Sequence, residues 1–252
     1  MRRPSRKRQP DRGTPQRRGK FSRELAVLYE DDAVVAVNKP PGLLAVPIPG
    51  SDAPSALSLL LEYLKPRRQD AWIVHRIDRF ASGALLFAKT KTDREALVRE
   101  FLAHTPVRRY LAVVRGHLAG KEGTLVHYFR KEGMHQKLST AKDPEAARAE
   151  LSYSLERSLR GASLLRVELL TGLQNQIRVQ LAAIDHPVVG DRKYSPKEAS
   201  ETRITRVALH AEFLQFVHPR SGEIVAVNAD LPPDFRSLLN SLTPRPGGQH
   251  RS

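Results

Sequence analysis

The sequence predicts an α+β domain built on a largely antiparallel sheet. Many short apolar runs of strand length follow one another in hairpin-like succession, and only a few helix-like segments lie between them. The sequence lacks the strict alternation of strand and helix that is typical of a parallel sheet. A length of 252 residues with 40% hydrophobic residues is enough for one large or two small domains with a proper core.

The first part of the domain is expected to open with a strand pair. From about Leu25, two short apolar runs flank an acidic turn at residues 30–32, and the Pro-Pro-Gly sequence at 40–42 must end the second strand. Segment 55–63 has the apolar spacing of a helix, which Pro66 would end.

The central part alternates between expected strands and a helix. Residues 84–88 form a continuous apolar run that predicts a buried strand. Thr92 and Glu95 have the spacing of a capping box, so we expect a helix to begin there, with Leu97 and Phe101 one turn apart on one face.

The second half is expected to consist mainly of strands. Segments 109–116 and 124–129 are typical of strands, and segments 149–156 and 163–170 predict a hairpin. Between these two pairs, residues 131–148 are polar and interrupted by glycine and proline, which predicts a long loop.

A helix should follow the polar turn at residues 171–172, with Arg178 at the border of its apolar face. Segments 207–217 and 224–228 complete the expected strands. We therefore expect one catalytic domain over residues 25–240, followed by a flexible Pro/Gly-rich tail at 241–252.

Charge is concentrated at the N-terminus. The chain has 42 basic and 27 acidic residues, a formal net charge of +15 and a pI of about 10.4, which indicates a polyanionic partner. Residues 1–24 carry ten basic residues against two acids, so they supply +8 of this charge. With almost no apolar residues and three prolines, this segment is expected to be a disordered electrostatic arm.

Several classes of protein are disfavoured by composition. Without cysteine there can be no disulfide framework or thiolate chemistry. The nine histidines show no paired metal-ligand spacing, and no stretch is apolar enough to span a bilayer or to act as a secretory signal. We therefore expect a cytoplasmic protein, monomeric, that needs neither metal nor cofactor.

Asp78 is the first candidate for chemistry. It lies between Arg76 and Arg79, whose positive charges favour the ionised carboxylate, which suits a nucleophile or base. Tyr110 could supply an aromatic platform and Arg178 a cation for Asp78. Taken singly, each also has an ordinary interpretation as a surface ion pair, a packed strand residue or a solvated cation.

Residues 75–89, His-Arg-Ile-Asp-Arg-Phe-Ala-Ser-Gly-Ala-Leu-Leu-Phe-Ala-Lys, resemble a signature of the RluA-type RNA pseudouridine synthases, H-R-[LI]-D-x-x-[TS]-S-G-[LA]-L-L-x-A-K, and depart from it at Ala81, where Thr is common. Five further blocks resemble the same family, in the family's order and over roughly residues 25–235. They are the opening strand pair with its Lys-Pro-Pro-Gly turn, 109–116, 171–179, 186–194 and 208–219.

The resemblance implies a fold, an activity and a set of site residues. The fold would be the pseudouridine synthase fold, an antiparallel sheet with flanking helices and a central RNA-binding cleft. Asp78 would be the catalytic aspartate, Tyr110 the residue that stacks on the target base, and Arg178 the ion-pair partner of Asp78. Arg76 would contact RNA near the flipped nucleotide, and Gln176 would also bind substrate.

The chemistry expected of this family needs no redox agent, nucleotide or metal. Uridine becomes pseudouridine when the N1–C1′ bond breaks and a C5–C1′ bond forms. An ionised Asp78 could attack C1′ or remove the C2′ proton to give a glycal, and the sequence leaves both routes open. Ribosomal RNA of the large subunit and transfer RNA are both open as substrates.

The chain also departs from the family pattern. Leu173, Gln174 and Asn175 replace the common residues of the turn before Arg178, which puts RNA contacts from this turn in doubt. Residues 1–24 are too short for the S4-type RNA-binding domain of many relatives. The alternative is an inactive RNA-binding or ribosome-associated protein that retains the fold, and the presence of Asp78, Tyr110 and Arg178 together favours the enzyme.

Other polar residues have simpler interpretations. His75, His186 and His210 are expected to be loop and core hydrogen-bonding residues, since none has a paired nucleophile in the sequence. Asp191 is expected to stabilise its own loop. Lys39, in the Lys-Pro-Pro-Gly turn, could be either a turn residue or a phosphate contact.

Overall fold

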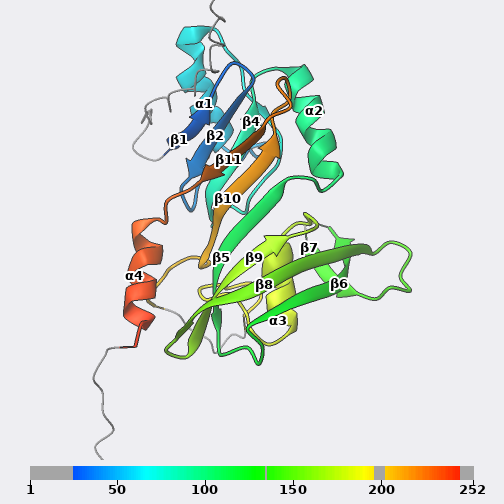
Figure 1. Cartoon of the computed structure of the whole chain (residues 1–252), viewed down its shortest axis with the longest axis vertical. Helices are drawn as coiled ribbons and strands as arrows, with labels where there is room; N and C mark the ends of the chain where they lie inside the picture. Colours follow the sequence, from blue (N-terminus) through cyan, green and yellow to red (C-terminus); the bar gives the residue numbers. More distant parts are fainter. Residues whose placement is uncertain (1–24, 134, 196–201, 245–252) are drawn as a thin grey trace, which may run out of the picture.

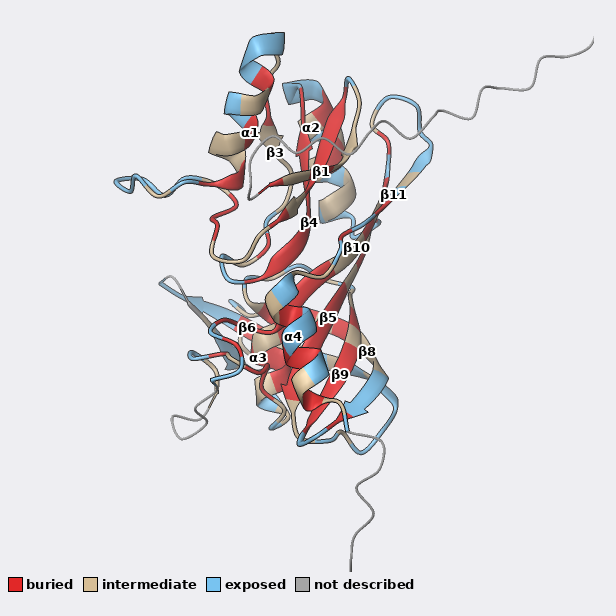
Figure 2. Cartoon of the chain, turned by 90° about the vertical axis from the view of Figure 1, so that its left-hand side faces the viewer, coloured by how far each residue is buried: buried red, intermediate tan, exposed pale blue. Residues whose placement is uncertain are grey.

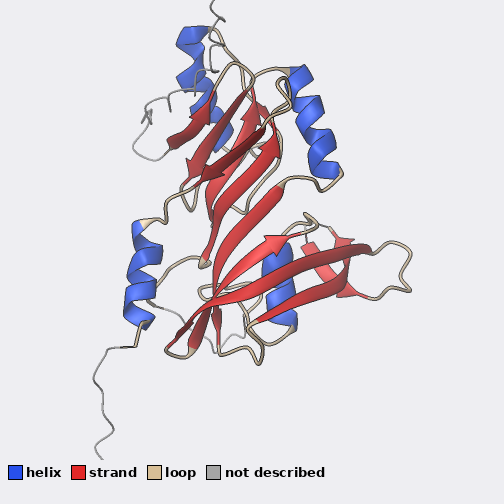
Figure 3. Cartoon of the chain, viewed as in Figure 1, coloured by secondary structure: helices blue, strands red, loops and turns tan. Residues whose placement is uncertain are grey.

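A computed structural model of the protein describes residues 25–133, 135–195 and 202–244 (Figure 1). The proposed basic arm at 1–24 lies outside the described residues, as does most of the proposed C-terminal tail. The chain forms one mixed sheet with helices on its faces, which confirms the predicted α+β class (Figure 3).

Within the described residues the sheet contains eleven strands. They are β1 (Ala26–Glu30), β2 (Val34–Lys39), β3 (Trp72–Ile73), β4 (Ser82–Ala88), β5 (Val107–Arg115), β6 (Glu122–Glu132), β7 (His135–Ser139), β8 (Ala147–Leu159), β9 (Ala162–Leu169), β10 (Leu209–Val217) and β11 (Ile224–Asn228). Their order in the sheet is β1-β2-β4-β10-β5-β9-β8-β6-β7, with β11 beside β10 and β3 beside β4.

The pairing of β4 with β10 joins the two halves of the molecule. It is the one parallel pairing among the described strands, and all the others are antiparallel. His210 and Ala211 pair there with Ser82 and Gly83. Gly83 has a φ of +116°, and a Cβ at this position would lie 2.2 Å from the carbonyl oxygen of Ala211. Only glycine permits this approach of the two backbones.

The helices occupy separate parts of the sheet (Figure 1). They are α1 (Ala56–Leu64), with the short 3-10 turn Lys65–Arg67 after it, α2 (Lys91–Leu102), α3 (Gln176–Ala183) and α4 (Pro233–Leu242). Helices α1 and α2 cover the half that contains β1, β2 and β4, whereas α3 lies against the half formed by β5 to β9.

Buried residues occur along the strands in both halves of the sheet (Figure 2). Every residue of β4 is buried, which confirms the strand predicted from the apolar run at 84–88. The largest apolar cluster joins β5, β8 and β9 to α3 and α4, and a second one packs α1 on β2 and β4. The strands that carry the site thus rest on buried apolar packing in both halves of the sheet.

Three predictions about elements were wrong. Helix α2 begins earlier than predicted, because the Thr90 side chain accepts the Asp93 backbone N–H and serves as the N-cap in place of Thr92. The predicted loop at 131–148 contains the end of β6, all of β7 and the start of β8. These strands have mostly exposed or half-buried side chains, so their sequence lacks the apolar signal of a buried strand.

Helix α4 is the third difference, because no helix was predicted over residues 233–242. It continues to Leu242, beyond the expected domain end at residue 240. Phe235, Leu238, Leu239 and Leu242 are buried in the same core as Tyr110. Thus α4 belongs to the core of the domain that carries the site.

Candidate active site

A cleft of about 880 Å³ opens between the two halves of the sheet, and all five residues predicted to form the site line it. Asp78 and Arg76 come from the loop before β4, Tyr110 from β5, and Gln176 and Arg178 from the first turn of α3. Residues up to a hundred positions apart in the sequence therefore meet in one place.

The backbone around Asp78 is a tight turn. The Ala81 N–H donates to the Asp78 carbonyl at 3.1 Å, and the Gly42 N–H donates to the Arg79 carbonyl at 2.8 Å. Arg79 in turn donates from Nε to the Gly42 carbonyl at 3.0 Å. Hydrogen bonds in both directions thus join the turn at 40–42 to the turn that carries Asp78. The Lys-Pro-Pro-Gly sequence therefore helps to hold the Asp78 turn in place.

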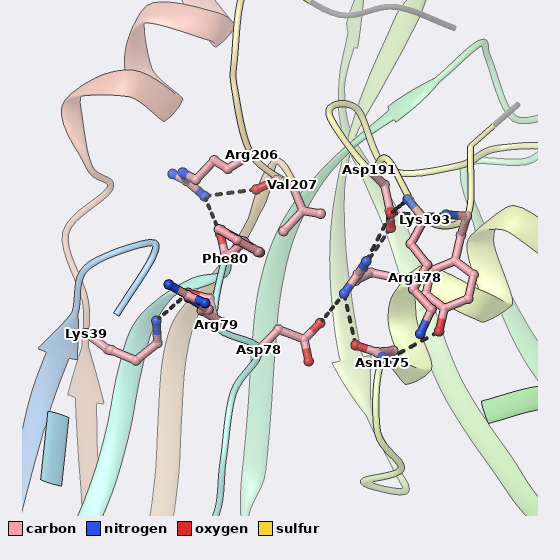
Figure 4. Close-up of polar contacts among 11 residues, drawn as sticks. Lys39, Asp78, Arg79, Phe80, Asn175, Arg178, Asp191, Lys193, Arg206 and Val207 are labelled. Atoms are coloured by element: carbon pink, nitrogen blue, oxygen red, sulfur yellow. Dashed lines mark hydrogen bonds and ion pairs between the residues drawn. The ribbon is translucent and has the colours of Figure 1, made fainter. Parts of the chain in front are cut away.

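Asp78 forms an ion pair with Arg178 (Figure 4). Nη1 of Arg178 lies 3.1 Å from Oδ2 of Asp78, and the side chains of Arg178 and Asp78 are only 12% and 21% exposed. The second carboxylate oxygen, Oδ1, has no hydrogen-bond partner among the described residues. The charge of Asp78 is therefore balanced on one side while one oxygen remains available.

Asp191 holds Arg178 from the opposite side (Figure 4). Its fully buried carboxylate accepts Nε of Arg178 at 2.6 Å and Nη2 at 3.0 Å, a bidentate arrangement with fixed geometry. Burial opposes the charge of Arg178, but Asp191 and Asp78 outweigh this effect and raise the pKa of Arg178 above its ordinary value. Arg178 is charged at any physiological pH.

The position of Asp191 follows from the path of its loop. The loop runs along β5, where the Val189 N–H donates to the Val113 carbonyl at 2.8 Å. Oδ1 of Asp191 also accepts the backbone N–H of Lys193 at 2.9 Å and of Tyr194 at 3.2 Å. The prediction that Asp191 stabilises its loop is confirmed, but its contact with Arg178 was missed. No local sequence pattern indicated this contact.

Asn175 completes the set of groups around Arg178. Its Oδ1 accepts Nη1 of Arg178 at 2.9 Å, and its Nδ2 donates to the Tyr194 hydroxyl at 3.3 Å. Asn175 has a φ of +55°, a conformation that asparagine tolerates better than most residues. A residue that departs from the family pattern thus has a local function, which is to help orient the cation.

The remaining predicted residues differ in accessibility. Burial raises the pKa of Tyr110 to about 12, so its hydroxyl stays protonated. Arg76 is exposed at the cleft. Gln176 is only 2% exposed, and its amide accepts from Thr171 and Leu173 and donates to the Glu150 carbonyl. These bonds organise the turn before α3, and an RNA contact by Gln176 stays a prediction.

Two buried basic side chains, Lys39 and Arg206, support the Asp78 turn (Figure 4). Lys39 is completely buried, and its Nζ donates to the carbonyls of Pro40, Leu43 and Arg79 at 2.8, 2.8 and 3.1 Å. Burial lowers the pKa of Lys39 to about 7. Of the two roles left open by the sequence, the structure gives Lys39 that of a turn residue.

Arg206 is the second buried basic side chain. Its Nη1 donates to the carbonyls of Phe80 and Val207 at 3.4 and 2.9 Å, and its Nε and Nη2 bind Asp234 of α4 at 2.7 and 2.9 Å. Arg206 therefore connects the Asp78 turn to α4. No sequence pattern indicated this link, because α4 itself was not predicted.

The three histidines make the hydrogen bonds predicted for them. His75 accepts the Leu86 N–H at 3.2 Å, His210 bonds Ser82 at 2.9 Å, and Nδ1 of His186 lies 2.8 Å from the Arg115 carbonyl. Within the described ranges, no group of three or more His, Cys, Asp or Glu residues could hold a metal ion. In the same ranges, no helix is long and apolar enough to cross a membrane.

Comparison with known proteins agrees with this geometry. Residues 33–183 match the sequence profile of the family described as RNA pseudouridylate synthase. The chain is 36% identical over 231 residues to "Ribosomal large subunit pseudouridine synthase D" of Haemophilus influenzae, an alignment that covers 86% of this chain and 71% of that protein. It is 34% identical to "Uncharacterized RNA pseudouridine synthase YlyB" of Bacillus subtilis, with 87% and 73% covered.

The fold is also found among solved structures. "Human RNA Pseudouridylate Synthase Domain Containing 1" superposes with a TM-score of 0.72 at 25% identity, covering 90% of this chain and 91% of that one. "Human RNA Pseudouridylate Synthase Domain Containing 4" gives a TM-score of 0.70 at 22% identity, with 85% and 91% covered.

Proposed function

This chain belongs to the RNA pseudouridylate synthase family and is an RNA pseudouridine synthase, and from that premise we propose that it isomerises uridines in the RNA of the large ribosomal subunit with Asp78 as the catalytic residue. The observation that carries the proposal is the carboxylate of Asp78 at the cleft, paired through Oδ2 with Arg178. The names of the bacterial relatives support the choice of RNA.

The proposed chemistry uses Asp78 as an anion. In one route, Oδ1 attacks C1′ while the N1–C1′ bond breaks, so that a covalent ester holds the ribose until C5 of the rotated base displaces it. In the other route, Asp78 removes the C2′ proton as the N1–C1′ bond breaks, which gives a glycal, and this proton returns to C2′ when C5 bonds to C1′. In both routes C5 then loses its hydrogen as a proton and N1 gains a proton, so the reaction is balanced without a redox partner.

Substrate access requires the uridine to leave its stack, which costs a few kcal/mol and favours loops or frayed sites. Stacking on Tyr110, in the wall of the cleft, would recover about 1–3 kcal/mol. Arg76 is exposed at the same cleft and is suited to a phosphate or base contact near the flipped nucleotide.

The test is pseudouridine mapping of ribosomal and transfer RNA from cells that lack the protein, complemented with the wild type or with Asp78→Asn. We expect the wild type to restore pseudouridine at defined positions of large-subunit RNA, and Asp78→Asn to restore none while it still binds that RNA. Restored sites in transfer RNA would change the proposed substrate. Full activity of Asp78→Asn would refute the proposed catalytic role.

The same experiment addresses the alternative of an inactive RNA-binding protein, for which wild-type complementation would restore no pseudouridine. The cytoplasmic location expected from the sequence stays a prediction. Chromatography of the full chain with light scattering tests whether it is monomeric.

A route-specific test separates the two chemistries. Substitution of deuterium for the C2′ hydrogen should slow the glycal route, because that route breaks the C2′–H bond, and should leave direct attack at C1′ nearly unchanged.

A further inference from the structure

Phe80 is an aromatic side chain exposed at the cleft. It is 50% exposed, and it is the one aromatic residue among the large hydrophobic residues that are exposed in the described part of the chain. It lies two residues after Asp78 and lines the same cleft. Leaving so large an apolar surface in water costs free energy, so its exposure invites a functional explanation.

The exposure of Phe80 does not arise from a loosely held loop. The carbonyl of the preceding residue, Arg79, accepts bonds from Gly42 at 2.8 Å and from Lys39 at 3.1 Å. The carbonyl of Phe80 itself accepts Nη1 of Arg206 at 3.4 Å. The backbone at this position is therefore fixed on both sides, and the ring is presented in advance of any ligand.

The surroundings of Phe80 are cationic. The Arg79 guanidinium lies over its ring, 5.4 Å from the centroid, and Arg76 and Arg178 line the same cleft. An apolar protein partner would have to bury these charges, whereas RNA would neutralise them with phosphates. Aromatic rings within a basic groove are the usual platforms on which nucleic-acid bases stack.

We propose that Phe80 stacks on the base adjacent to the flipped uridine, so that Arg79, Phe80 and this base form one column at the cleft. The inference rests on the proposed function, because it assumes that RNA enters the cleft with its target uridine at Asp78. Asp78 and Phe80 belong to one four-residue turn, closed by the Ala81 N–H that donates to the Asp78 carbonyl at 3.1 Å. The same short segment therefore presents both the carboxylate and the aromatic ring to the cleft.

The experiment compares the full-length wild type with Phe80→Leu and Phe80→Trp on an unmodified transcript of large-subunit RNA that carries tritium at C5 of uridine. Tritium is released after C5 forms its bond to C1′, so initial rates give KM and kcat. Leucine keeps an apolar side chain but cannot stack, whereas tryptophan can. Ile224→Ala, at a 69% exposed position on β11 outside the cleft, is the matched control.

We expect Phe80→Leu to raise KM by about 5- to 150-fold with kcat nearly unchanged, and Phe80→Trp and Ile224→Ala to behave like the wild type. An unchanged KM in Phe80→Leu would overturn the proposal, and so would Phe80→Trp with a KM as high as that of Phe80→Leu. A fall in kcat alone would also overturn it, because that result indicates a disturbed Asp78 turn.

Failure of the proposed function has a different signature. If the wild type releases no tritium from the transcript, the proposed function fails and this inference fails with it. If the wild type is active and Phe80→Leu matches it, only the inference fails.

A second arm uses a stem-loop around a mapped target uridine. An abasic nucleotide on one side of that uridine should abolish the Phe80→Leu penalty, and a penalty that survives abasic sites on both sides contradicts the proposal.

Discussion

At the scale of single residues, the site depends on one arginine shared by two carboxylates. Asp191 is fully buried and takes two N–H groups of Arg178, which leaves Nη1 directed at Asp78. Burying a single charge is energetically costly, and the ion pair between Asp191 and Arg178 offsets this cost for both side chains. Asp78 is the more exposed carboxylate of the two, which suits a group that must meet the substrate.

We expect Asp191→Asn to lower kcat about a hundredfold. The reason is that Arg178 loses its bidentate carboxylate partner and no longer holds Asp78 in place. The free energy of unfolding should fall by about 3–5 kcal/mol, the cost of an uncompensated buried charge. Tritium release and urea unfolding measure the two effects. Asp185→Asn, at an exposed position just after α3, is the control and should change neither.

His75 makes stability depend on pH. It stacks on Phe101 with the ring centroids 4.6 Å apart, and burial lowers its pKa to about 3. In the unfolded chain the pKa of His75 is near 6.5. Between pH 6.5 and 3, His75 is therefore protonated in the unfolded state but neutral in the folded state. The stabilisation is complete above pH 6.5 and is lost as the pH falls towards 3.

We therefore expect the free energy of unfolding to fall by up to about 1.4 kcal/mol per pH unit below pH 6.5 on account of this residue. Urea unfolding at pH 7, 6 and 5 measures the slope. His75→Gln should flatten it, because glutamine does not titrate, whereas the exposed His117→Gln should leave it unchanged. Equal slopes in the wild type and His75→Gln would contradict this account.

The site residues could be predicted from the sequence to the extent that they belong to a local pattern. Asp78 is framed by its neighbours, and Arg178 falls at the start of a helix. The Arg178–Asp191 contact depends instead on how a loop packs along β5, which no local spacing encodes. The role of Phe80 was also invisible, because exposure of an aromatic residue is known only once its turn has been placed.

At the scale of elements, local signal decided which predictions succeeded. Buried strands such as β4 were predicted because apolar residues mark them directly. Strand β7 and the outer part of β6 are held by backbone pairing at the edge of the sheet, with few buried side chains to mark them. Helix α4 gains much of its stabilisation from packing on a distant core, so short local patterns understate it.

The β4–β10 pairing is the element contact most sensitive to change. In Gly83→Ala the new Cβ would lie 2.2 Å from the Ala211 carbonyl oxygen, in a backbone conformation that alanine disfavours. We expect a decrease of about 3 kcal/mol or more in the free energy of unfolding. Gly161→Ala also has a positive φ but has open space around it, so it should cost only about 1–2 kcal/mol. Similar decreases in the two variants would contradict the steric argument.

At the scale of the whole molecule, charge is divided between the domain and the N-terminal segment. Residues 1–24 supply +8 of the formal +15, so the rest of the chain is only moderately basic. A polyanion such as RNA should therefore interact with both. The contribution of the segment is electrostatic and independent of sequence, since counterion release depends on charge.

We expect deletion of residues 1–24 to weaken RNA binding at low salt and to reduce the slope of log K against log salt. The slope falls by about 0.7 to 0.9 for each phosphate that the protein no longer neutralises. Binding titrations at several salt concentrations, with the transcript of large-subunit RNA, give this slope. The full chain with serine in place of six of the ten basic residues is the control for length. A slope unchanged by deletion would show that the segment does not touch RNA.

The uninterrupted sheet decides which partner must change shape during recognition. Asp78 precedes β4 and Arg178 follows β9, and β4, β10, β5 and β9 are consecutive members of the same sheet (Figure 1). Moving the two walls of the cleft apart would break backbone hydrogen bonds in the middle of the protein. We therefore expect the nucleic acid, rather than the sheet, to change shape on binding, so that uridines at easily deformed RNA sites are preferred.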